Sequence, residues 1–172
     1  ALADQQLGPT PTVFSGDPLM NVGVAMELSG WFTGRPTVTR GMDNVVRIDG
    51  LWRTTCFEAF VASAATGAYY EFNFAPSTEW AAYRFSAYRD GMTPALEAGE
   101  PDIQTRLNGS RLELQAQVHL DRLAALPAGG DLRLAVAAVL EETSGALSYW
   151  ALAHPPGKPD FHHRDGFIFQ LT

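Results

Sequence analysis

Cysteine, long apolar runs and an excess of positive charge are all scarce or missing in this sequence. Cys56 is the only cysteine, so no disulfide can form within the chain, and this usage fits a reducing compartment. No apolar run reaches the roughly 18 residues that a membrane-spanning helix needs. The formal net charge of −7 disfavours binding to nucleic acids or anionic membranes, because both need a basic surface. We therefore expect neither nucleic acid nor membrane as a partner.

The sequence also lacks the short motifs of several enzyme classes and of secreted precursors. It contains no nucleophile elbow, no phosphate-binding loop, no HExxH and no CxxC. Residues 1–11, ALADQQLGPTP, have neither a basic nor an apolar segment, so they are not an intact signal peptide. The first residue is not Met, and removal of a preceding segment stays open. We expect a cytoplasmic location.

The sequence consists instead of short segments in which apolar and polar residues alternate. Its 172 residues suffice for one domain with its own core, and no linker divides them, so we predict a single domain over 1–172. The spacing of the segments predicts an all-β protein with an antiparallel β-sandwich, and it leaves the oligomeric state open. We predict single strands over 21–32, 44–50, 79–89 and 161–171. We predict hairpins over 55–76, over 103–120 with a turn at Asn108-Gly109, and over 131–154 with a turn at Thr143–Gly145. A helical turn is predicted over 121–130, with Asp121 as its cap and Pro127 at its end.

Residues 68–92 combine eight aromatic side chains with charged and amide side chains. Successive strand residues face opposite sides, so neighbouring strands here would have one apolar face that packs on a second sheet. We predict that the other face carries one polar cluster set among aromatic residues. The cluster consists of Glu58, Glu71, Asn73 and Arg84. A solvated outer face with mixed charges is the alternative, but the aromatic density favours binding.

Residues 147–167 hold three of the four histidines, and Pro155, Pro156 and Pro159 stiffen this stretch. We predict that the segment 154–165 packs against the polar cluster beside Trp52 and Trp80. Its own donors and acceptors would be His154, Asp160 and His162, while tryptophan offers a flat apolar surface. In the alternative interpretation the histidines cap the last strand and bond only to the backbone.

Cofactor and catalytic interpretations are less specific. His162 and His163 would point apart on a strand, which disfavours a metal site. A haem would need an axial pair such as His162 or His154 with Met92 or Met42, and no spacing specifies one. Cys56 lies in an apolar strand and is interpreted as structural. Glu58 and Glu71 could act as paired carboxyl groups in glycoside hydrolysis. We expect no cofactor, with haem and calcium as the alternatives.

Three segments together resemble a known group of proteins: LWRTTCFEAFVA, YYEFNFAPSTEWAAYRFSAYRDGM and LSYWALAHPPGKPDFHHRDGF. They are similar to bacterial DOMON-like proteins related to family 9 carbohydrate-binding modules, and the match runs from about Val22 to the end. The resemblance implies a jelly-roll type β-sandwich and a ligand-binding role. In sugar-binding relatives aromatic residues stack on sugar rings, and Trp52, Trp80 and Trp150 are the matching type of residue. Haem-binding relatives use a Met with a His or Lys, and no Met here falls in an alignable motif.

Three functional hypotheses follow. The favoured one is a non-catalytic module that binds a carbohydrate or similar small polar ligand. The second is a haem-binding domain of the DOMON type, and the third is an enzyme that uses Glu58, Glu71 and the C-terminal histidines. An interaction protein without a small ligand stays open as a fourth.

Overall fold

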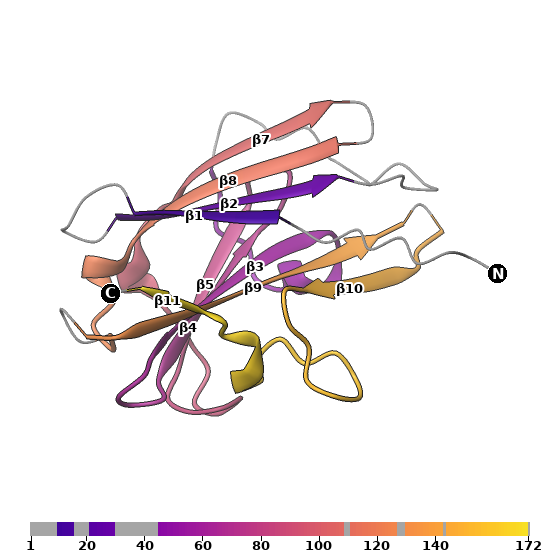
Figure 1. Cartoon of the computed structure of the whole chain (residues 1–172). Coiled ribbons are helices and arrows are strands. Elements are labelled where there is room, and N and C mark those ends of the chain that lie inside the picture. The colour runs from indigo at the N-terminus through magenta and orange to yellow at the C-terminus, as the bar shows by residue number, and fades with distance from the viewer. Residues whose placement is uncertain are drawn as a thin grey trace.

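The computed structural model describes residues 10–15, 21–29, 45–108, 111–126, 130–142 and 144–171. Strands in these ranges form two antiparallel sheets stacked as a β-sandwich (Figure 1), as predicted. The first sheet has the order β1 (Thr10–Ser15), β2 (Asn21–Ser29), β8 (Arg111–His119) and β7 (Asp102–Asn108). The second has the order β10 (Leu147–Ala151), β9 (Leu132–Glu141), β3 (Cys56–Ser63), β4 (Tyr69–Phe74), β5 (Trp80–Phe85) and β6 (Thr93–Pro94), and β11 (Phe169–Leu171) also pairs with β9.

The remaining regular structure consists of short 3₁₀ turns. These are η1 (Leu51–Arg53), η2 (Leu96–Ala98), η3 (Leu120–Arg122) and η4 (Arg164–Gly166). Within the described ranges, no helix has the length and apolar character that crossing a membrane requires.

The three predicted hairpins are confirmed as pairs of neighbouring strands: β3 with β4, β7 with β8, and β9 with β10. Of the residues predicted to turn in the last two hairpins, Gly109 and Thr143 lie outside the described residues. The strand predicted over 21–32 appears as β2, and its last three residues lie outside the described ranges.

Other predicted boundaries are wrong. The strand expected over 44–50 is only a bridge between Arg47 and Trp80. The strand expected over 161–171 is short, because a 3₁₀ turn precedes β11. The helical turn begins at Leu120 with His119 in the cap position, so Asp121 lies inside the turn and is not its cap, and Pro127 lies outside the described residues.

Both faces of the second sheet are covered, although the alternating pattern alone would require only one buried face. Side chains of one face, such as Tyr70, Phe72 and Phe74, form the core between the sheets. Side chains of the opposite face, such as Phe60, Tyr69 and Phe85, form a second apolar cluster on the outside of the sandwich. All six residues of β4 are buried as a result. The interpretation of a solvated outer face is therefore wrong.

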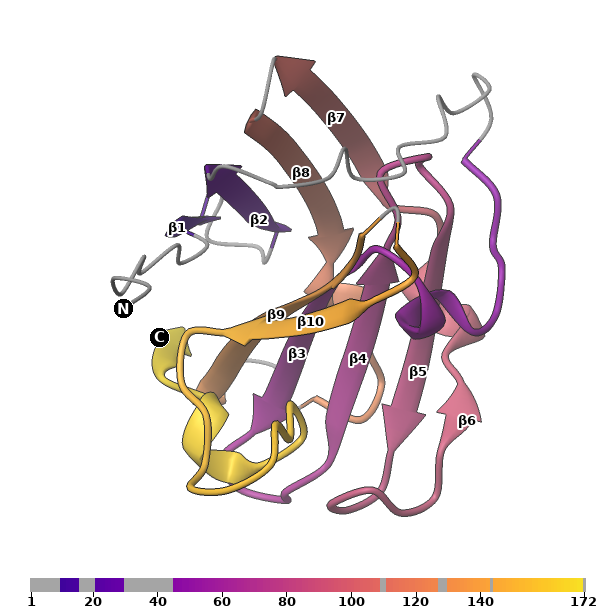
Figure 2. The ribbon, with the colours of Figure 1, turned by 90° about the vertical axis from the view of Figure 1, so that its right-hand side faces the viewer.

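The η1 turn contributes Leu51 and Trp52 to the cover of this outer face, and the larger covering element is the segment 152–168, drawn in yellow in Figure 2. The strands on either side of it, β10 and β11, both pair with the same edge of β9. Ala151 lies opposite Ala137, and Phe169 lies opposite Leu134, so the segment leaves and rejoins the sheet within three residues of β9. Compact loops with such close ends pack through their own side chains and are frequently functional. This pairing holds the segment beside β3 and β4.

Candidate functional site

A cavity of about 430 Å³ opens on the outer face of the second sheet, under the segment 152–168. Ligand sites in proteins commonly have about 300–1,000 Å³ and combine apolar walls with a few placed polar groups. We call it the acidic cavity, because two carboxyl groups lie in its wall. Its lining consists of Trp52, Glu58, Glu71, Phe85, Arg89, Met92, Val139, Tyr149, Pro159, Phe161 and His162.

The two carboxyl groups come from adjacent strands. Glu58 lies opposite Asn73 in the β3–β4 pairing, so Glu71 is its diagonal neighbour on the same face. Both glutamates and Asn73 are buried. The Asn73 amide donates a 2.7 Å hydrogen bond to Glu71 Oε1, and its Oδ1 lies 3.4 Å from Cys56 Sγ. The polar cluster predicted from the sequence therefore exists for these three residues.

Burial changes the acidity of both carboxyl groups. Desolvation, then the charge of Glu71, raises the pKa of Glu58 well above its usual 4.5, against a smaller lowering by Arg89. Desolvation also raises the pKa of Glu71, although the hydrogen bond from Asn73 and the charge of Arg89 both act to lower it. Glu58 consequently keeps its proton to a higher pH than an exposed glutamate and can then both donate and accept hydrogen bonds.

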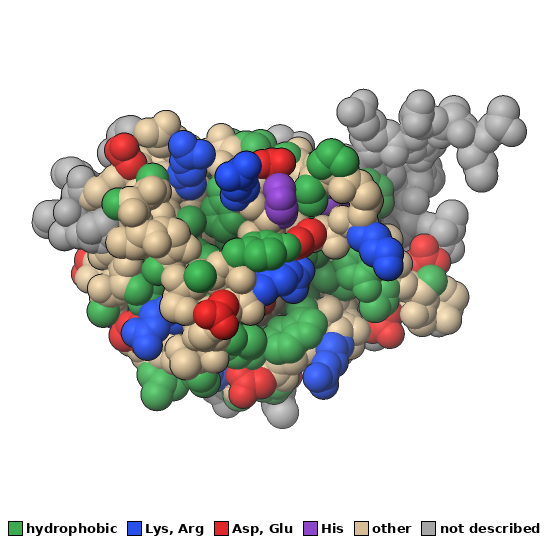
Figure 3. Space-filling model, turned by 90° about the horizontal axis from the view of Figure 1, so that it is seen from below, with side chains coloured by type: hydrophobic (Ala, Val, Ile, Leu, Met, Phe, Trp, Pro, Cys, Tyr) green, Lys and Arg blue, Asp and Glu red, His purple; other side chains and the backbone are tan. Residues whose placement is uncertain are grey.

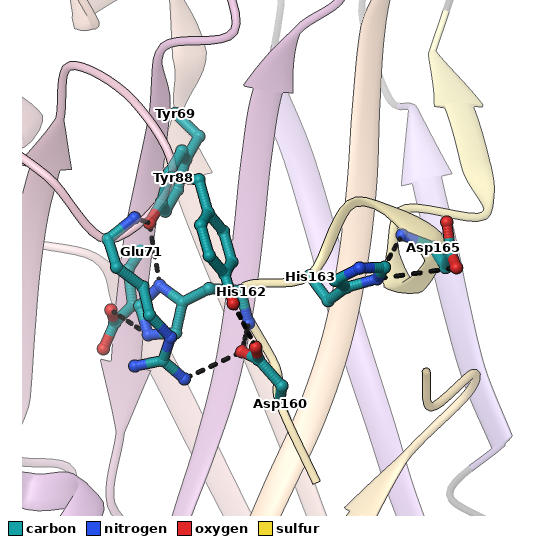
Figure 4. A network of polar contacts seen from close by, with 8 residues as sticks. Tyr69, Glu71, Tyr88, Asp160, His162, His163 and Asp165 are labelled. Carbon is teal, nitrogen blue, oxygen red and sulfur yellow. Dashed lines mark hydrogen bonds and ion pairs between the residues drawn. The ribbon is translucent and has the colours of Figure 1, made fainter. Parts of the chain in front are cut away.

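His162 connects the covering segment to the floor of the cavity (Figure 4). Its Nδ1 lies 2.8 Å from the Tyr69 hydroxyl, and its Nε2 lies 3.7 Å from Glu71 Oε2. Burial, and secondly the charge of Arg89, lowers the pKa of His162 to about 4, so the ring is neutral at neutral pH. A neutral ring that accepts from Tyr69 at Nδ1 carries its proton on Nε2 and directs it toward the Glu71 carboxylate. In the other tautomer, the bare Nε2 and the carboxylate oxygen would be two acceptors facing each other.

A tight turn after β5 supplies the other attachment of the covering segment. Ala87 and Asp90 form a bridge, and Arg89 between them has a left-handed φ of 53°. The Arg89 guanidinium contacts Asp160 at 2.7 Å, and the Tyr88 hydroxyl donates to the same carboxylate. Asp160 also accepts from the backbone N–H of His162 at 3.1 Å. His162 therefore does more than bond to the backbone, and the predicted packing of this segment against the cluster is confirmed beside Trp52 but not beside Trp80.

Arg84 does not join the cluster, and that prediction is wrong. Residues directly opposite in an antiparallel pair share a face, and Glu71 lies opposite Tyr83, whereas Arg84 lies opposite Tyr70. The connection from Phe74 to Trp80 sets this register, and a change of one residue in it would have reversed the faces. Arg84 instead lies 3.8 Å from Glu97 and is half exposed. Arg89, which the sequence analysis did not select, is the cation beside the glutamates.

The aromatic residues of the cavity differ in part from those predicted. Trp52 does line it, with its ring edge-on to Tyr83 at 5.5 Å. Trp80 belongs to the core between the sheets. Trp150 also packs on that core, and its neighbour Tyr149 lines the cavity in its place. Strand alternation could have distinguished Tyr149 from Trp150 only if the pairing of β10 with β9 had been known.

His154 is placed outside the cavity as well, and is exposed with its ring centre 5.9 Å from that of Phe161. His163 points away from His162 toward Asp165, as Figure 4 shows. Among the residues that the structure describes, no three potential metal ligands of the His, Cys, Asp or Glu type come together.

This cavity does not present Met92 and His162 as a free pair of axial ligands for a haem. Met92 and His162 both line it, but the His162 nitrogens already face Tyr69 and Glu71. Met42, the other methionine considered from the sequence, lies outside the described residues. The contacts of His162 thus disfavour a haem in this cavity.

Comparison with solved structures shows a shared fold. A Bacteroides uniformis protein with a proposed carbohydrate-binding role is 13% identical to this chain and has a TM-score of 0.58, with 96% of this chain and 84% of that chain covered. A family 9 carbohydrate-binding module from Caldicellulosiruptor kristjanssonii, solved in complex with glucose, is 12% identical and has a TM-score of 0.47, with 86% and 67% covered. No protein-family model matches the sequence, and a comparison with curated proteins gave no match.

Proposed function

We propose that this protein is a non-catalytic carbohydrate-binding module, and that the acidic cavity is its binding site. The observation that carries the proposal is the pairing of hydrogen-bonding groups with aromatic walls in one cavity. Glu58, Glu71 and Arg89 offer acceptors and donors, while Trp52 and Tyr149 offer flat apolar surfaces. Sugar hydroxyls both donate and accept, and the C–H faces of a sugar ring are apolar, so such a mixture suits a sugar.

The local burial supports a preorganised site. Asn73 and His162 hold Glu71 from two sides, and Arg89 is held by Asp160. Groups fixed before binding lose little conformational freedom when a ligand arrives. The Bacteroides uniformis protein, which has the same fold, carries a proposed carbohydrate-binding role, and this is consistent with the same class of ligand here.

We also infer a relationship to the DOMON-like proteins that the sequence resembles. The three segments that carry the resemblance are 51–62, 69–92 and 147–167. Together they supply every lining residue of the acidic cavity except Val139. Segments far apart in the chain thus meet at one place, which is expected if a common site accounts for their similarity.

A direct test is titration of the protein with a panel of neutral mono- and disaccharides by isothermal calorimetry. We expect at least one sugar to bind with a dissociation constant in the millimolar to micromolar range, which corresponds to a favourable binding free energy of about 4–8 kcal/mol. Glu71→Gln and Tyr149→Ala should each weaken it by about tenfold or more. Tyr149 is 47% exposed, so its truncation should leave the fold intact.

The matched control is Leu96→Ala, which removes an exposed apolar side chain outside the cavity. Its affinity should equal that of the unaltered protein. Equal affinity in the Tyr149 variant and in the Leu96 variant would show that sugars bind elsewhere. Absence of binding across the panel would contradict the proposal.

A hydrolytic role is the second candidate, because Glu58 and Glu71 are neighbouring carboxyl groups and both have raised pKa values. Glycosidases commonly use one carboxyl group as acid and a second as base or nucleophile. Chromatography of the bound sugars after prolonged incubation separates the two functions. Release of products that depends on both glutamates would favour the enzyme, and unchanged sugars would favour the binding module.

A further inference from the structure

A second cavity, of about 540 Å³, adjoins the acidic cavity and shares the side chain of His162 with it. We call it the basic cavity. Its lining consists of Ala62, Ser63, Ala64, Gly67, Tyr69, Tyr88, Arg133, His162, His163, Arg164 and Phe167. Figure 3 shows this end of the molecule, where basic, acidic and hydrophobic side chains lie around a histidine.

The two cavities differ in their charged side chains, because the acidic cavity combines two glutamates with Arg89. The lining of the basic cavity includes two arginines, Arg133 and Arg164, and no carboxyl group. The protein as a whole carries a net charge of −7, so this is a local reversal of sign. Two aspartates lie nearby. Asp160 is held by Tyr88 and Arg89, and Asp165 lies 3.5 Å from His163 Nδ1 and 3.8 Å from Arg164 Nε.

The shape of the basic cavity leaves room for a ring. Small residues of the β3–β4 hairpin, among them Ala62, Ala64 and Gly67, form one wall. A side-chain carbon placed on Gly67 would meet no atom within 4 Å, so the space above it is open. Tyr88 is 54% exposed at the cavity and presents a flat aromatic surface. Aromatic surfaces of this kind pack well against sugar rings.

We propose that the basic cavity binds the anionic group of an acidic sugar, such as the carboxylate of a uronic acid, while a neighbouring sugar unit occupies the acidic cavity. This proposal rests on the carbohydrate-binding function proposed above. Arg133 projects from the outer face of β9, and Arg164 belongs to η4. Arginine is well suited to a carboxylate, because its planar fork of N–H donors matches two oxygens. His162, in the wall between the cavities, would contact both units.

The test compares matched disaccharides by calorimetry, each as the neutral sugar, as the uronate and as the uronate methyl ester. We expect the uronate to bind more tightly than the other two, with a preference that shrinks as salt rises from 50 to 500 mM. The double variant Arg133→Gln/Arg164→Gln should lower the ratio of uronate to neutral affinity by about five- to tenfold. Both arginines are exposed, so the variant should fold.

The control is the double variant Arg106→Gln/Arg122→Gln, which removes the same two charges from exposed positions outside both cavities and should leave the ratio unchanged. A ratio that falls equally in the control would show a general charge effect and overturn the proposal. An unchanged ratio in the double variant, or no preference for the uronate at all, would also overturn it while neutral-sugar binding stands. If none of the three forms binds, the proposed function fails together with this inference.

Discussion

The two faces of strand β4 are equally buried but chemically different. Phe72 faces the core between the sheets and is 1% exposed, whereas Glu71 and Asn73 face outward and are 5% and 0% exposed. The inner face is covered by the first sheet and packs in an apolar cluster. The outer face is covered by the segment 152–168, which brings hydrogen-bonding partners with it. Burial by a sheet therefore supports stability here, and burial by a loop creates a polar cavity.

The largest expected effect tests the inner face. Phe72→Ala should lower the free energy of unfolding by about 3–5 kcal/mol, because it removes a large side chain from a closely packed core. Urea denaturation measures this change. A loss below about 1 kcal/mol would mean that the inner face is not the main apolar core.

A smaller loss is expected on the outer face. Asn73→Ala removes the 2.7 Å hydrogen bond to Glu71 and leaves a buried carboxyl oxygen without this partner. We expect a cost of about 1–3 kcal/mol in the free energy of unfolding. Gln104→Ala, an exposed amide on β7, is the matched control and should cost much less. Equal losses in both variants would contradict the buried cluster.

The acidity of Glu58 gives a pH-dependent comparison. A raised pKa in the folded state means that the folded protein holds this proton more tightly, so the contribution is present below pH 4.5 and is lost as the pH rises through the raised pKa. The stability of the unaltered protein relative to Glu58→Gln should therefore fall above pH 4.5, with a slope of at most about 1.4 kcal/mol per pH unit. Urea denaturation at a series of pH values measures it.

The lowered pKa of His162 changes the free energy of unfolding with pH in the opposite direction over part of this range. Burial lowers its pKa to about 4, so its contribution is present above its usual value of 6.5 and is lost as the pH falls toward 4. Both proteins contain His162, and its contribution cancels in the difference. Glu100→Gln, at an exposed glutamate, should show no such slope. A flat difference for Glu58→Gln would mean that Glu58 is not desolvated.

The smallest effect is expected at Arg84. Because Arg84 is half exposed and lies 3.8 Å from Glu97, Arg84→Ala should change the free energy of unfolding by no more than about 0.5 kcal/mol. Arg89→Ala should cost more, because it frees Asp160 from its 2.7 Å contact. Thermal and urea unfolding of the two variants compare them. A larger loss at Arg84 than at Arg89 would reverse the assignment of faces.

The sequence by itself determined the class of fold and much of the site. Alternation predicted the hairpins and placed Glu71 and Asn73 on one face, because side-chain direction repeats every two residues along a strand. Glu58 was correctly assigned to the same face of the β3–β4 hairpin. The histidines and aspartate of 154–165 correctly indicated a segment that packs beside that face. These are local properties, or they follow from a single hairpin.

The tertiary structure decided what depends on register and on strand order. The connection between β4 and β5 placed Tyr83 beside Glu71 and turned Arg84 to the other face. No residue type in the sequence specifies which alternate residues of β5 share the face of Glu71. The turn at Arg89 brought in a different arginine, because its left-handed backbone ends the alternation. Pairing of both β10 and β11 with one edge of β9 brought 152–168 over the outer face. Contacts between segments far apart in the chain follow from how the strands pair, and this is why only the folded structure revealed the complete cavity.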